Sequence, residues 1–362
     1  MSSKNPLKRI FDLYTSDLSF TEIERLIKRE SAEVYEFFKN DIPKSSTSRN
    51  KVVRSLIFLR SLFNAFLLKL SPARRIIYLL TLLIFILGYL NNMGSYVIIS
   101  FVILNFLLAF ELADKLLTKS ELQVARKIQT DLMPKIPPKI NNYEVSAYYE
   151  SAKEVGGDYF DIFKSETGDK TYLIVGDISG KGMAAALYMV RVQAILHSLI
   201  SNFSDLREII INLKDNFDKK LLPEYFLTLA AASIDEEGSI TLCRAGHPPI
   251  IHFKSSTDSF EEINPKGIGI GLKDNGAFAK ILETVEIKPD TNDILFFYTD
   301  GITECMNESR QQLGLNPVKN VIRKYAGSPP EIIQKEIVKE IEKFRGENIH
   351  SDDITMIILK AI

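Results

Sequence analysis

Two long apolar runs dominate the first third of the chain. Ile76 to Leu90 and Tyr96 to Phe110 each contain 15 residues and no charged side chain, and Asn91 to Ser95 between them has a turn-like composition. As helices these runs would measure about 22 Å, less than the roughly 30 Å hydrocarbon core of a bilayer. The pattern predicts a transmembrane hairpin of two short helices within residues 71–112. A single kinked span, and a re-entrant or soluble core element, are the alternatives.

A charged segment with an apolar stripe follows the hairpin. Residues 111–133 contain no Gly or Pro, so a linker helix is expected within residues 113–140, ended by Pro134 and the prolines after it. The stripe fits either a short coiled coil that pairs two copies of the chain as a homodimer or a helix packed on its own domain. It consists of apolar residues at three- and four-residue spacings, namely Leu112, Leu116, Leu122, Ala125, Ile128 and Leu132.

From residue 141 to residue 362 the pattern changes to short β-like runs separated by turns. The runs are Tyr143–Tyr149, Tyr159–Phe163, Thr171–Ile178, Leu227–Ile234, Ser239–Arg244, Ile250–Phe253, Ile294–Thr299 and Ile354–Leu359. Helical patterns interrupt them at Met183–Ser201, Leu206–Lys219 and Pro330–Phe344. Consecutive strands and grouped helices predict an α+β domain with largely antiparallel sheets rather than a doubly wound parallel fold.

Charge is distributed unevenly before the hairpin. Residues 1–70 form an N-terminal region with one helix expected near Phe20 to Asn40. From Ile42 to Arg75 there are eight basic residues and no acidic one, whereas 30 basic and 38 acidic residues follow. Within that stretch Lys51 to Leu70 is rich in Leu and Phe. It suits either an anionic membrane surface or a small soluble domain.

The charges beside the hairpin also predict its orientation. Arg74 and Arg75 precede the first run, and Lys115 and Lys119 follow the second. The positive-inside rule places both ends in the cytoplasm, which an even number of spans allows. We therefore expect a multi-pass protein of the cytoplasmic (inner) membrane with the 141–362 domain in the cytoplasm.

The overall composition excludes several classes of protein. Among 362 residues, 45 Lys plus Arg stand against 46 Asp plus Glu, which argues against a general nucleic-acid binder. Two cysteines, Cys243 and Cys305, cannot form a disulfide framework or a Cys-rich zinc site, and neither lies in a Cys-x5-Arg phosphatase loop. Four histidines do not suggest a His-built metal centre.

Four segments of the 141–362 domain place Asp where a β-like run meets a turn. Converging carboxylates repel one another unless a cation lies between them, and ligands that are all oxygen suit Mg²⁺ or Mn²⁺. An Asp that caps a turn explains any one segment, but four in one domain favour a metal centre. The segments are GGDYFD with Asp158 and Asp161, IVGDISGKG with Asp177, FFYTDGITE with Asp300, and SDDIT with Asp352 and Asp353.

Other motifs in this domain give weaker evidence for a functional site than the Asp-bearing segments. Gly176–Lys181 is one residue short of a phosphate-binding loop, and Gly182 replaces the required Ser or Thr. GIGIGL at Gly267–Leu272 lacks a βαβ context and is expected to be a loop. His247 in AGHPP is expected to order a loop rather than bind a metal. Lys181 either attracts a phosphate or is solvated.

A family resemblance rests on five motifs in chain order: EVGGDYFD, YLIVGDISGKGMAAAL, LCRAGHPPI, LFFYTDGITE and SDDITMIIL. They resemble the SpoIIE/RsbU-type branch of the metal-dependent PPM (PP2C-like) protein serine/threonine phosphatases, over about Leu122 to Leu359. The resemblance implies a PP2C-like sandwich of two antiparallel β-sheets flanked by helices. It also implies two ions, Mn²⁺ or Mg²⁺, at one edge, and hydrolysis of phosphoserine or phosphothreonine by a water that the metals activate.

The same resemblance assigns roles to individual residues. Asp177 would bridge the two ions and act with Asp158 and Asp300 as the catalytic set, while the Ile178 carbonyl would ligate one ion. The implied ligands all lie at strand ends: Asp158, Asp177, Ile178, Asp300, Asp352 and, as second choice within SDDIT, Asp353.

This chain differs from the animal-type members of the family at one position. Those relatives carry a His, a proposed general acid, two residues after the bridging Asp, where this chain has Ser179. The proton for the leaving oxygen must then come from water or another group. Lys181 and Gly301 are expected in the vicinity of the phosphate.

The sequence thus predicts a membrane-tethered, metal-dependent protein serine/threonine phosphatase. In this branch the substrate is typically a phosphorylated anti-sigma-factor antagonist, and the phosphatase follows a sensory module, although no recognisable sensor precedes it here. A catalytically silent signalling adaptor is the alternative from another class. A membrane-bound nucleotide cyclase, which also joins a helical linker to two-metal carboxylates, is a further alternative.

Overall fold

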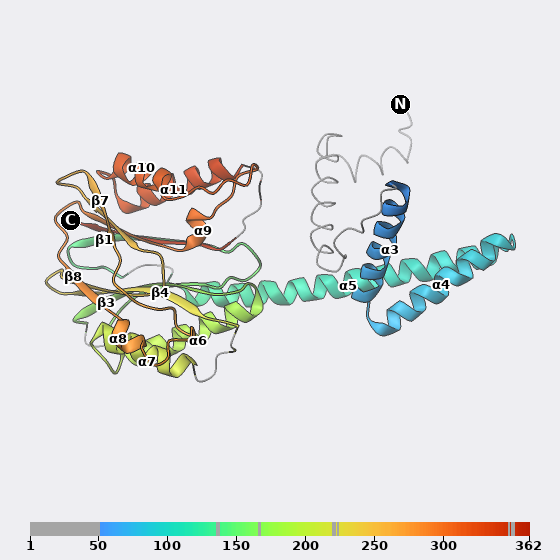
Figure 1. Cartoon of the computed structure of the whole chain (residues 1–362), viewed down its shortest axis with the longest axis horizontal. Helices are drawn as coiled ribbons and strands as arrows, with labels where there is room; N and C mark the ends of the chain where they lie inside the picture. Colours follow the sequence, from blue (N-terminus) through green and yellow to red (C-terminus); the bar gives the residue numbers. More distant parts are fainter. Residues whose placement is uncertain are drawn as a thin grey trace, which may run out of the picture. The chain divides into compact units, whose positions relative to one another are not determined.

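The computed structural model describes residues 51–362 except 135–137, 166–167, 219–221, 223, 347 and 349–351. The helix expected near Phe20 to Asn40 lies outside the described residues. The chain divides into two compact units, Met1–Leu116 and Leu117–Ile362 (Figure 1).

Three helices make up the described part of the first unit: α3 (Lys51–Lys69), α4 (Pro72–Leu90) and the beginning of α5 (Gly94–Leu132). Helices α4 and α5 form a hairpin around a turn in which Asn92 has a φ of 53°. A Cβ at Gly88 would lie 2.7 Å from the Tyr96 Cβ, so glycine permits the close approach of the two helices beside the turn.

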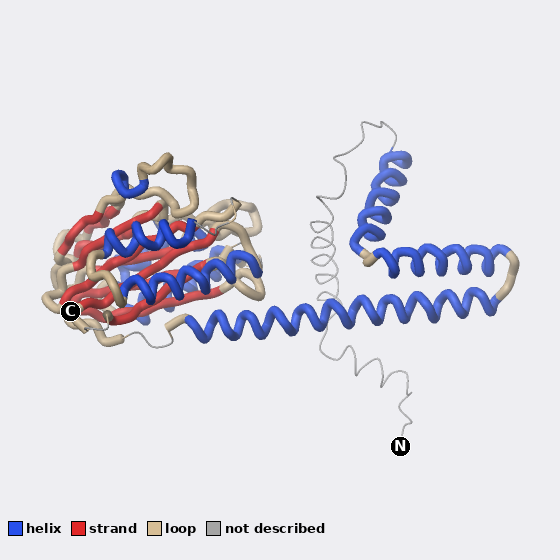
Figure 2. Tube along the Cα trace, turned by 90° about the horizontal axis from the view of Figure 1, so that it is seen from below, coloured by secondary structure: helices blue, strands red, loops and turns tan. Residues whose placement is uncertain are grey.

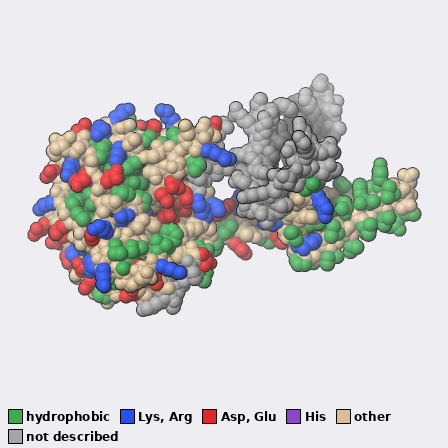
Figure 3. Space-filling view, in the orientation of Figure 1, with side chains coloured by type: hydrophobic (Ala, Val, Ile, Leu, Met, Phe, Trp, Pro, Cys, Tyr) green, Lys and Arg blue, Asp and Glu red, His purple; other side chains and the backbone are tan. Residues whose placement is uncertain are grey.

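The hairpin presents apolar side chains to its surroundings. Hydrophobic side chains cover the visible surface of α4 and of the hairpin part of α5 (Figure 3). Both helices are long and apolar enough to cross a membrane, which is consistent with membrane association. Helix α6 (Met183–Ile200) also meets that criterion, but one of its faces is buried in the second unit.

Ten strands in the described part of the second unit form two five-stranded antiparallel sheets. One sheet has the order β1-β10-β9-β6-β7 and the other β2-β3-β4-β5-β8. The strands are β1 (Tyr143–Glu150), β2 (Asp158–Lys164), β3 (Lys170–Ile178), β4 (Leu227–Asp235), β5 (Ile240–Ala245), β6 (Ile250–Lys254), β7 (Ser259–Ile263), β8 (Thr284–Ile287), β9 (Ile294–Tyr298) and β10 (Ile354–Ala361).

Helices cover both outer faces of this sandwich. Helices α10 (Asn316–Tyr325) and α11 (Pro330–Arg345) lie over the β1-containing sheet, and α6 and α7 (Leu206–Asp218) lie over the other (Figures 1 and 2). Two one-turn helices, α8 (Phe278–Ile281) and α9 (Asp300–Thr303), occupy connections. The predicted α+β sandwich of two antiparallel sheets flanked by helices is confirmed.

The core explains why the ends of the central strands are rigid. Alternate residues of β9 point to opposite faces, so Phe297 packs between the two sheets while Phe296 and Tyr298 pack beneath α10 and α11. The neighbouring strand β10 is buried along its whole length. Residues that directly follow β9 or precede β10 are therefore held by packing on both sides of the sheet.

Candidate metal centre

Asp158 and Asp177 meet across two neighbouring strands. Asp158 begins β2 and Asp177 lies near the end of β3, and the antiparallel register makes them direct partners. Gly157 permits this approach, because a Cβ there would lie 2.8 Å from the Ile178 carbonyl oxygen and 3.4 Å from the Asp177 Oδ1. The sheet that contains β2 and β3 thus contributes two carboxylates and one carbonyl to the same edge.

The other sheet contributes the remaining predicted residues. Asp300 opens α9 directly after β9, and Asp352 and Asp353 come just before β10, the hydrogen-bonded neighbour of β9. Gly301 is buried here, and a Cβ at this position would lie 1.9 Å from the Asp353 carbonyl oxygen. Gly301 therefore allows the turn after β9 to lie directly against the SDDIT segment.

Asp158 connects the two sheets through hydrogen bonds. Its Oδ2 accepts bonds from the Thr299 hydroxyl at 2.8 Å and from the Thr355 hydroxyl at 2.5 Å. Burial and then the charge of Asp177 raise the pKa of Asp158 well above its ordinary value, although both hydroxyls oppose this change. Neither threonine was predicted, but each stands in a recognised motif, Thr299 directly before Asp300 and Thr355 in SDDIT.

The negative charges of the other carboxylates also act on Asp177. Burial raises the pKa of Asp177 to about 7, with further increases from Asp300, Asp352 and Asp353. Desolvation, followed by Glu304 and Asp352, raises the pKa of Asp300. Such mutual repulsion is the electrostatic condition that a bound cation relieves.

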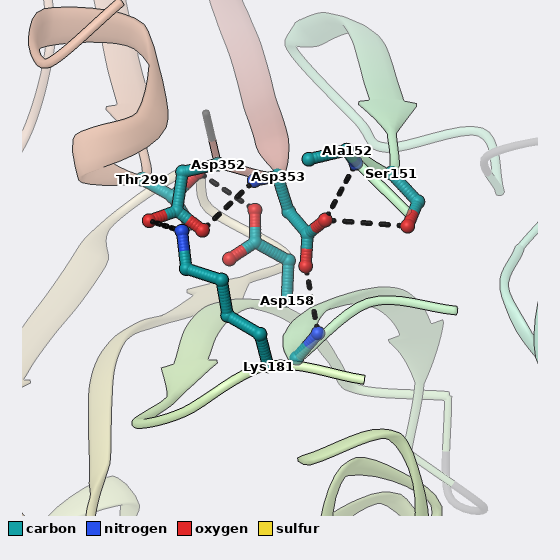
Figure 4. A network of polar contacts seen from close by, with 8 residues as sticks. Ser151, Ala152, Asp158, Lys181, Thr299, Asp352 and Asp353 are labelled. Carbon is teal, nitrogen blue, oxygen red and sulfur yellow. Dashed lines mark hydrogen bonds and ion pairs between the residues drawn. The ribbon is translucent and has the colours of Figure 1, made fainter. Parts of the chain in front are cut away.

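Asp352 and Asp353 have different partners (Figure 4). The Lys181 ammonium donates to the Asp352 Oδ2 at 2.7 Å. Asp353 instead accepts backbone N–H bonds from Ala152 and Gly157, each at 2.7 Å, and a longer bond from the Ser151 hydroxyl. Asp353 thus holds the β1–β2 connection in place, which leaves Asp352 as the better candidate for a metal ligand.

The donor chemistry fits a hard divalent cation. The oxygens come from carboxylates and from the Ile178 carbonyl, and the carboxylates are close enough to shift one another's pKa values. Within the described residues, no group of three or more His, Cys, Asp or Glu side chains is yet close enough to hold a metal.

Three other residues singled out from the sequence have structural partners. The Ser179 hydroxyl accepts the Phe226 backbone N–H at 2.8 Å. His247 is buried, its Nδ1 lies 2.9 Å from the Thr228 hydroxyl oxygen, and burial lowers its pKa to about 3. Asp161 is buried beside His197, whose Nε2 lies 2.7 Å from the Asp161 carboxylate, so it lies apart from the carboxylate cluster.

The end of the linker helix contacts this site through glutamines that the sequence did not reveal as functional. The Gln129 side chain is buried, donates to the Gly156 carbonyl at 2.7 Å and accepts the Gly156 N–H at 3.2 Å. Gln193 of α6 donates to the Leu132 carbonyl at 2.6 Å. The linker is therefore hydrogen-bonded both to the loop that precedes Asp158 and to the helix that follows Asp177.

Comparison with known proteins identifies the family. The family model for Stage II sporulation protein E (SpoIIE) matches residues 167–362, more than half of the chain. The chain belongs to the SpoIIE family. Phosphoserine phosphatase RsbU of Bacillus subtilis (strain 168) is 24% identical over 243 residues, which cover 67% of this chain and 70% of RsbU.

Solved structures share the fold. The SiaA-PP2C domain of Pseudomonas aeruginosa has a TM-score of 0.60 at 19% identity and covers 69% of this chain and 99% of its own. The RsbU and RsbW domains of a Mycobacterium tuberculosis protein have a TM-score of 0.55 at 23% identity, over 64% of this chain and 63% of that one. Family, relative and fold agree on the protein serine/threonine phosphatases of PP2C type, a metal-dependent class.

Proposed function

We propose that this chain is a membrane-tethered, metal-dependent protein serine/threonine phosphatase with its catalytic unit in the cytoplasm. One observation carries the proposal. Asp158 and Asp177 from one sheet, and Asp300 and Asp352 from the other, come together at one edge of a PP2C-like sandwich in a SpoIIE-family chain.

The residues at this edge would hold two divalent ions, Mn²⁺ or Mg²⁺. Asp177 would contribute a bridging carboxylate, and Asp158, Asp300, Asp352 and the Ile178 carbonyl would complete the ligand set. When bound, such ions supply a water of lowered pKa and neutralise phosphate charge. The Thr299 and Thr355 hydroxyls orient Asp158 for this role, because a hydrogen bond to a ligating carboxylate fixes the direction of its oxygens.

Other residues would bind the phosphate and manage the proton. Lys181 is half-exposed and its ammonium bonds to Asp352, so it can also offer a hydrogen bond to an incoming phosphate oxygen. Gly301 keeps the turn after β9 close to the Asp352–Asp353 segment. Ser179 stands where animal-type relatives have a His, and a serine hydroxyl is a far weaker acid than an imidazolium, so we propose that water protonates the leaving oxygen.

The substrate we propose is a phosphorylated regulatory protein of the anti-sigma-factor antagonist type. RsbU is named as a phosphoserine phosphatase, and an RsbU domain shares a structure with an RsbW domain in the mycobacterial protein. The apolar hairpin would be the tether. Exposed Val124, Ile128 and Leu132 on the linker would pair two copies of the chain.

The assay that tests the proposal uses the full chain in detergent with p-nitrophenyl phosphate and with a protein phosphorylated on Ser and Thr. We expect hydrolysis that requires Mn²⁺ or Mg²⁺ and stops when a chelator is added. A folded chain that hydrolyses neither substrate at any metal concentration would indicate a silent adaptor. Release of pyrophosphate from ATP or GTP would indicate a nucleotide cyclase instead.

A further inference from the structure

Helix α3 combines exposed apolar side chains with basic residues and contains no acidic one. Its sequence, KVVRSLIFLRSLFNAFLLK, carries Lys51, Arg54, Arg60 and Lys69. Leu59 and Leu68 are 62% and 68% exposed. Other large apolar side chains of the described part of α3 are also exposed, namely Ile57, Phe63 and Phe66. An exposed apolar surface of this kind on a short helix needs a covering partner.

Contacts with α4 fix the position of α3. The Arg75 guanidinium donates to the carbonyls of Leu67, Leu68 and Leu70 at 2.8, 3.2 and 3.2 Å, and so caps the end of α3 from the first turn of α4. The Tyr78 ring packs edge-on against Phe66, with ring centres 5.6 Å apart. Helix α3 consequently lies crosswise to α4 in both views of the molecule (Figures 1 and 2).

The crosswise helix lies at the charged end of the hairpin. Arg74 pairs with Glu111 at 2.9 Å and with Asp114 across the open end, opposite the turn after Leu90. Lys and Arg side chains are visible at this end, whereas hydrophobic ones cover the hairpin toward its turn (Figure 3). Only Leu70 and Ser71 separate α3 from α4, so α3 cannot move far from any bilayer that the hairpin spans.

We propose that α3 is a lipid-binding helix that lies in the cytoplasmic interface of the bilayer and binds anionic phospholipid headgroups. The proposal rests on the membrane tether proposed above. The exposed Leu and Phe side chains enter the boundary of the acyl chains, while the exposed Arg60 and Lys69 heads reach the phosphates on long apolar stems. Because α3 has four basic residues and no acidic one, anionic lipid is its complementary partner.

The test places an environment-sensitive fluorophore on the full chain in lipid nanodiscs. Both native cysteines are buried, so a Cys introduced at Leu59 can be labelled selectively. We expect a blue-shifted emission, and quenching by headgroup-level nitroxide lipids, in discs of phosphatidylcholine with phosphatidylglycerol. Discs of phosphatidylcholine alone should give weaker quenching, and high salt should weaken quenching in the anionic discs. Equal spectra and equal quenching in both discs would overturn the proposal.

A charge-reversed variant separates lipid binding from general charge effects. Arg60→Glu with Lys69→Glu should reduce the bound-to-unbound ratio of the labelled helix in anionic discs by about fivefold or more per residue changed. Lys127→Glu with Lys335→Glu makes the same change in net charge at exposed positions of the second unit and should leave that ratio unchanged. Equal losses in the two variants would contradict the proposal, because they would show an effect of net charge alone.

A second probe keeps failure of the tether distinguishable from failure of this inference. Phe101 is 65% exposed on the hairpin, and a fluorophore there should be quenched by nitroxides deep in the acyl chains of either disc. A quenched Phe101 probe with an unquenched Leu59 probe would overturn the role of α3 alone. An unquenched Phe101 probe would overturn the tether itself.

Discussion

Asp158 on β2 and Asp177 on β3 are direct cross-strand partners, and the pKa of each carboxyl is raised by burial and by neighbouring carboxylates. Like charges directly opposite each other destabilise a sheet. When its carboxylates are ionised, this edge of the sandwich therefore costs folding free energy, which protonation or a bound cation recovers.

The first prediction concerns stability against pH in the absence of divalent metal. Asp177 has a pKa of about 7 in the folded chain against an ordinary 3.8, so the folded state holds the proton more tightly than the unfolded chain. The resulting stabilisation is complete below about pH 4 and is lost as the pH rises toward about 7. Asp177→Asn removes the contribution of Asp177 to this dependence, while Asp158 and Asp300 retain theirs. Between those pH values the variant should therefore gain stability relative to wild type, by up to about 4 kcal/mol.

Denaturant unfolding of the second unit, Leu117–Ile362, followed by circular dichroism in a chelator, measures this difference. Asp215→Asn changes an exposed carboxylate on α7 and serves as the control, with no comparable trend expected. Saturating Mn²⁺ should abolish the trend in wild type. A wild-type and Asp177→Asn difference that stays constant from acid to neutral pH would contradict the prediction.

The second prediction separates Asp352 from Asp353. Asp353→Ala leaves the N–H groups of Ala152 and Gly157 without their acceptor and should cost about 1–3 kcal/mol of unfolding free energy. Asp352→Asn should leave stability nearly unchanged but raise the Mn²⁺ concentration for half-maximal activity by about tenfold or more, since even groups that only orient ligands contribute that much. Thermal melts and Mn²⁺ titrations of both variants measure these effects. If Asp352→Asn lost stability and Asp353→Ala mainly required more Mn²⁺, the assignment of the two residues would be reversed.

The third prediction concerns membrane topology. A Cys introduced at Asn92, in the turn between α4 and α5, should react with an impermeant reagent added to intact cells. A Cys at exposed Asp215 of the second unit should react only after the cells are opened. Labelling of the Asp215 position in intact cells would show that the orientation is wrong.

The fourth prediction concerns the linker. Ile128 and Leu132 are exposed, while Gln129 is buried against Gly156, so neighbouring faces of the helix serve different contacts. Ile128→Asp with Leu132→Asp should change basal turnover several-fold and reduce oligomer size without altering the metal ligands. Turnover, Mn²⁺ dependence and oligomer size of the second unit should be compared with and without the two changes. If all three quantities were the same with and without the two changes, the linker would be only a passive tether.

Much of the sandwich could be predicted because its central strands are strongly patterned. The eight predicted β runs correspond to β1 to β6, β9 and β10 with bounds shifted by one or two residues. The two missed strands, β7 and β8, are both edge strands. Each is short and largely exposed. The adjacent Glu261 and Glu262 interrupt the alternation in β7, and β8 has only four residues, too few for a clear strand pattern. Helix α10 was not predicted because Pro317 stands near its start, although proline is well tolerated in the first turn of a helix.

Less of the candidate site than of the fold could be predicted from the sequence. The Asp-bearing segments could be found because each stands where a β-like run meets Gly or another turn residue. The contacts that distinguish them could not, because they join residues far apart in the chain, such as Lys181 with Asp352 and Gln129 with Gly156. Only the folded sheets bring these partners together.

The most direct test of the account is the Mn²⁺-dependent hydrolysis of p-nitrophenyl phosphate by the full chain and by Asp177→Asn. A bridging carboxylate replaced by a neutral amide should lower turnover at saturating Mn²⁺ by at least about a hundredfold, as expected when several kcal/mol of transition-state stabilisation are lost. Asp215→Asn should retain wild-type turnover, and circular dichroism should show both variants folded. A folded Asp177→Asn chain with near wild-type turnover at saturating Mn²⁺ would contradict the two-metal site.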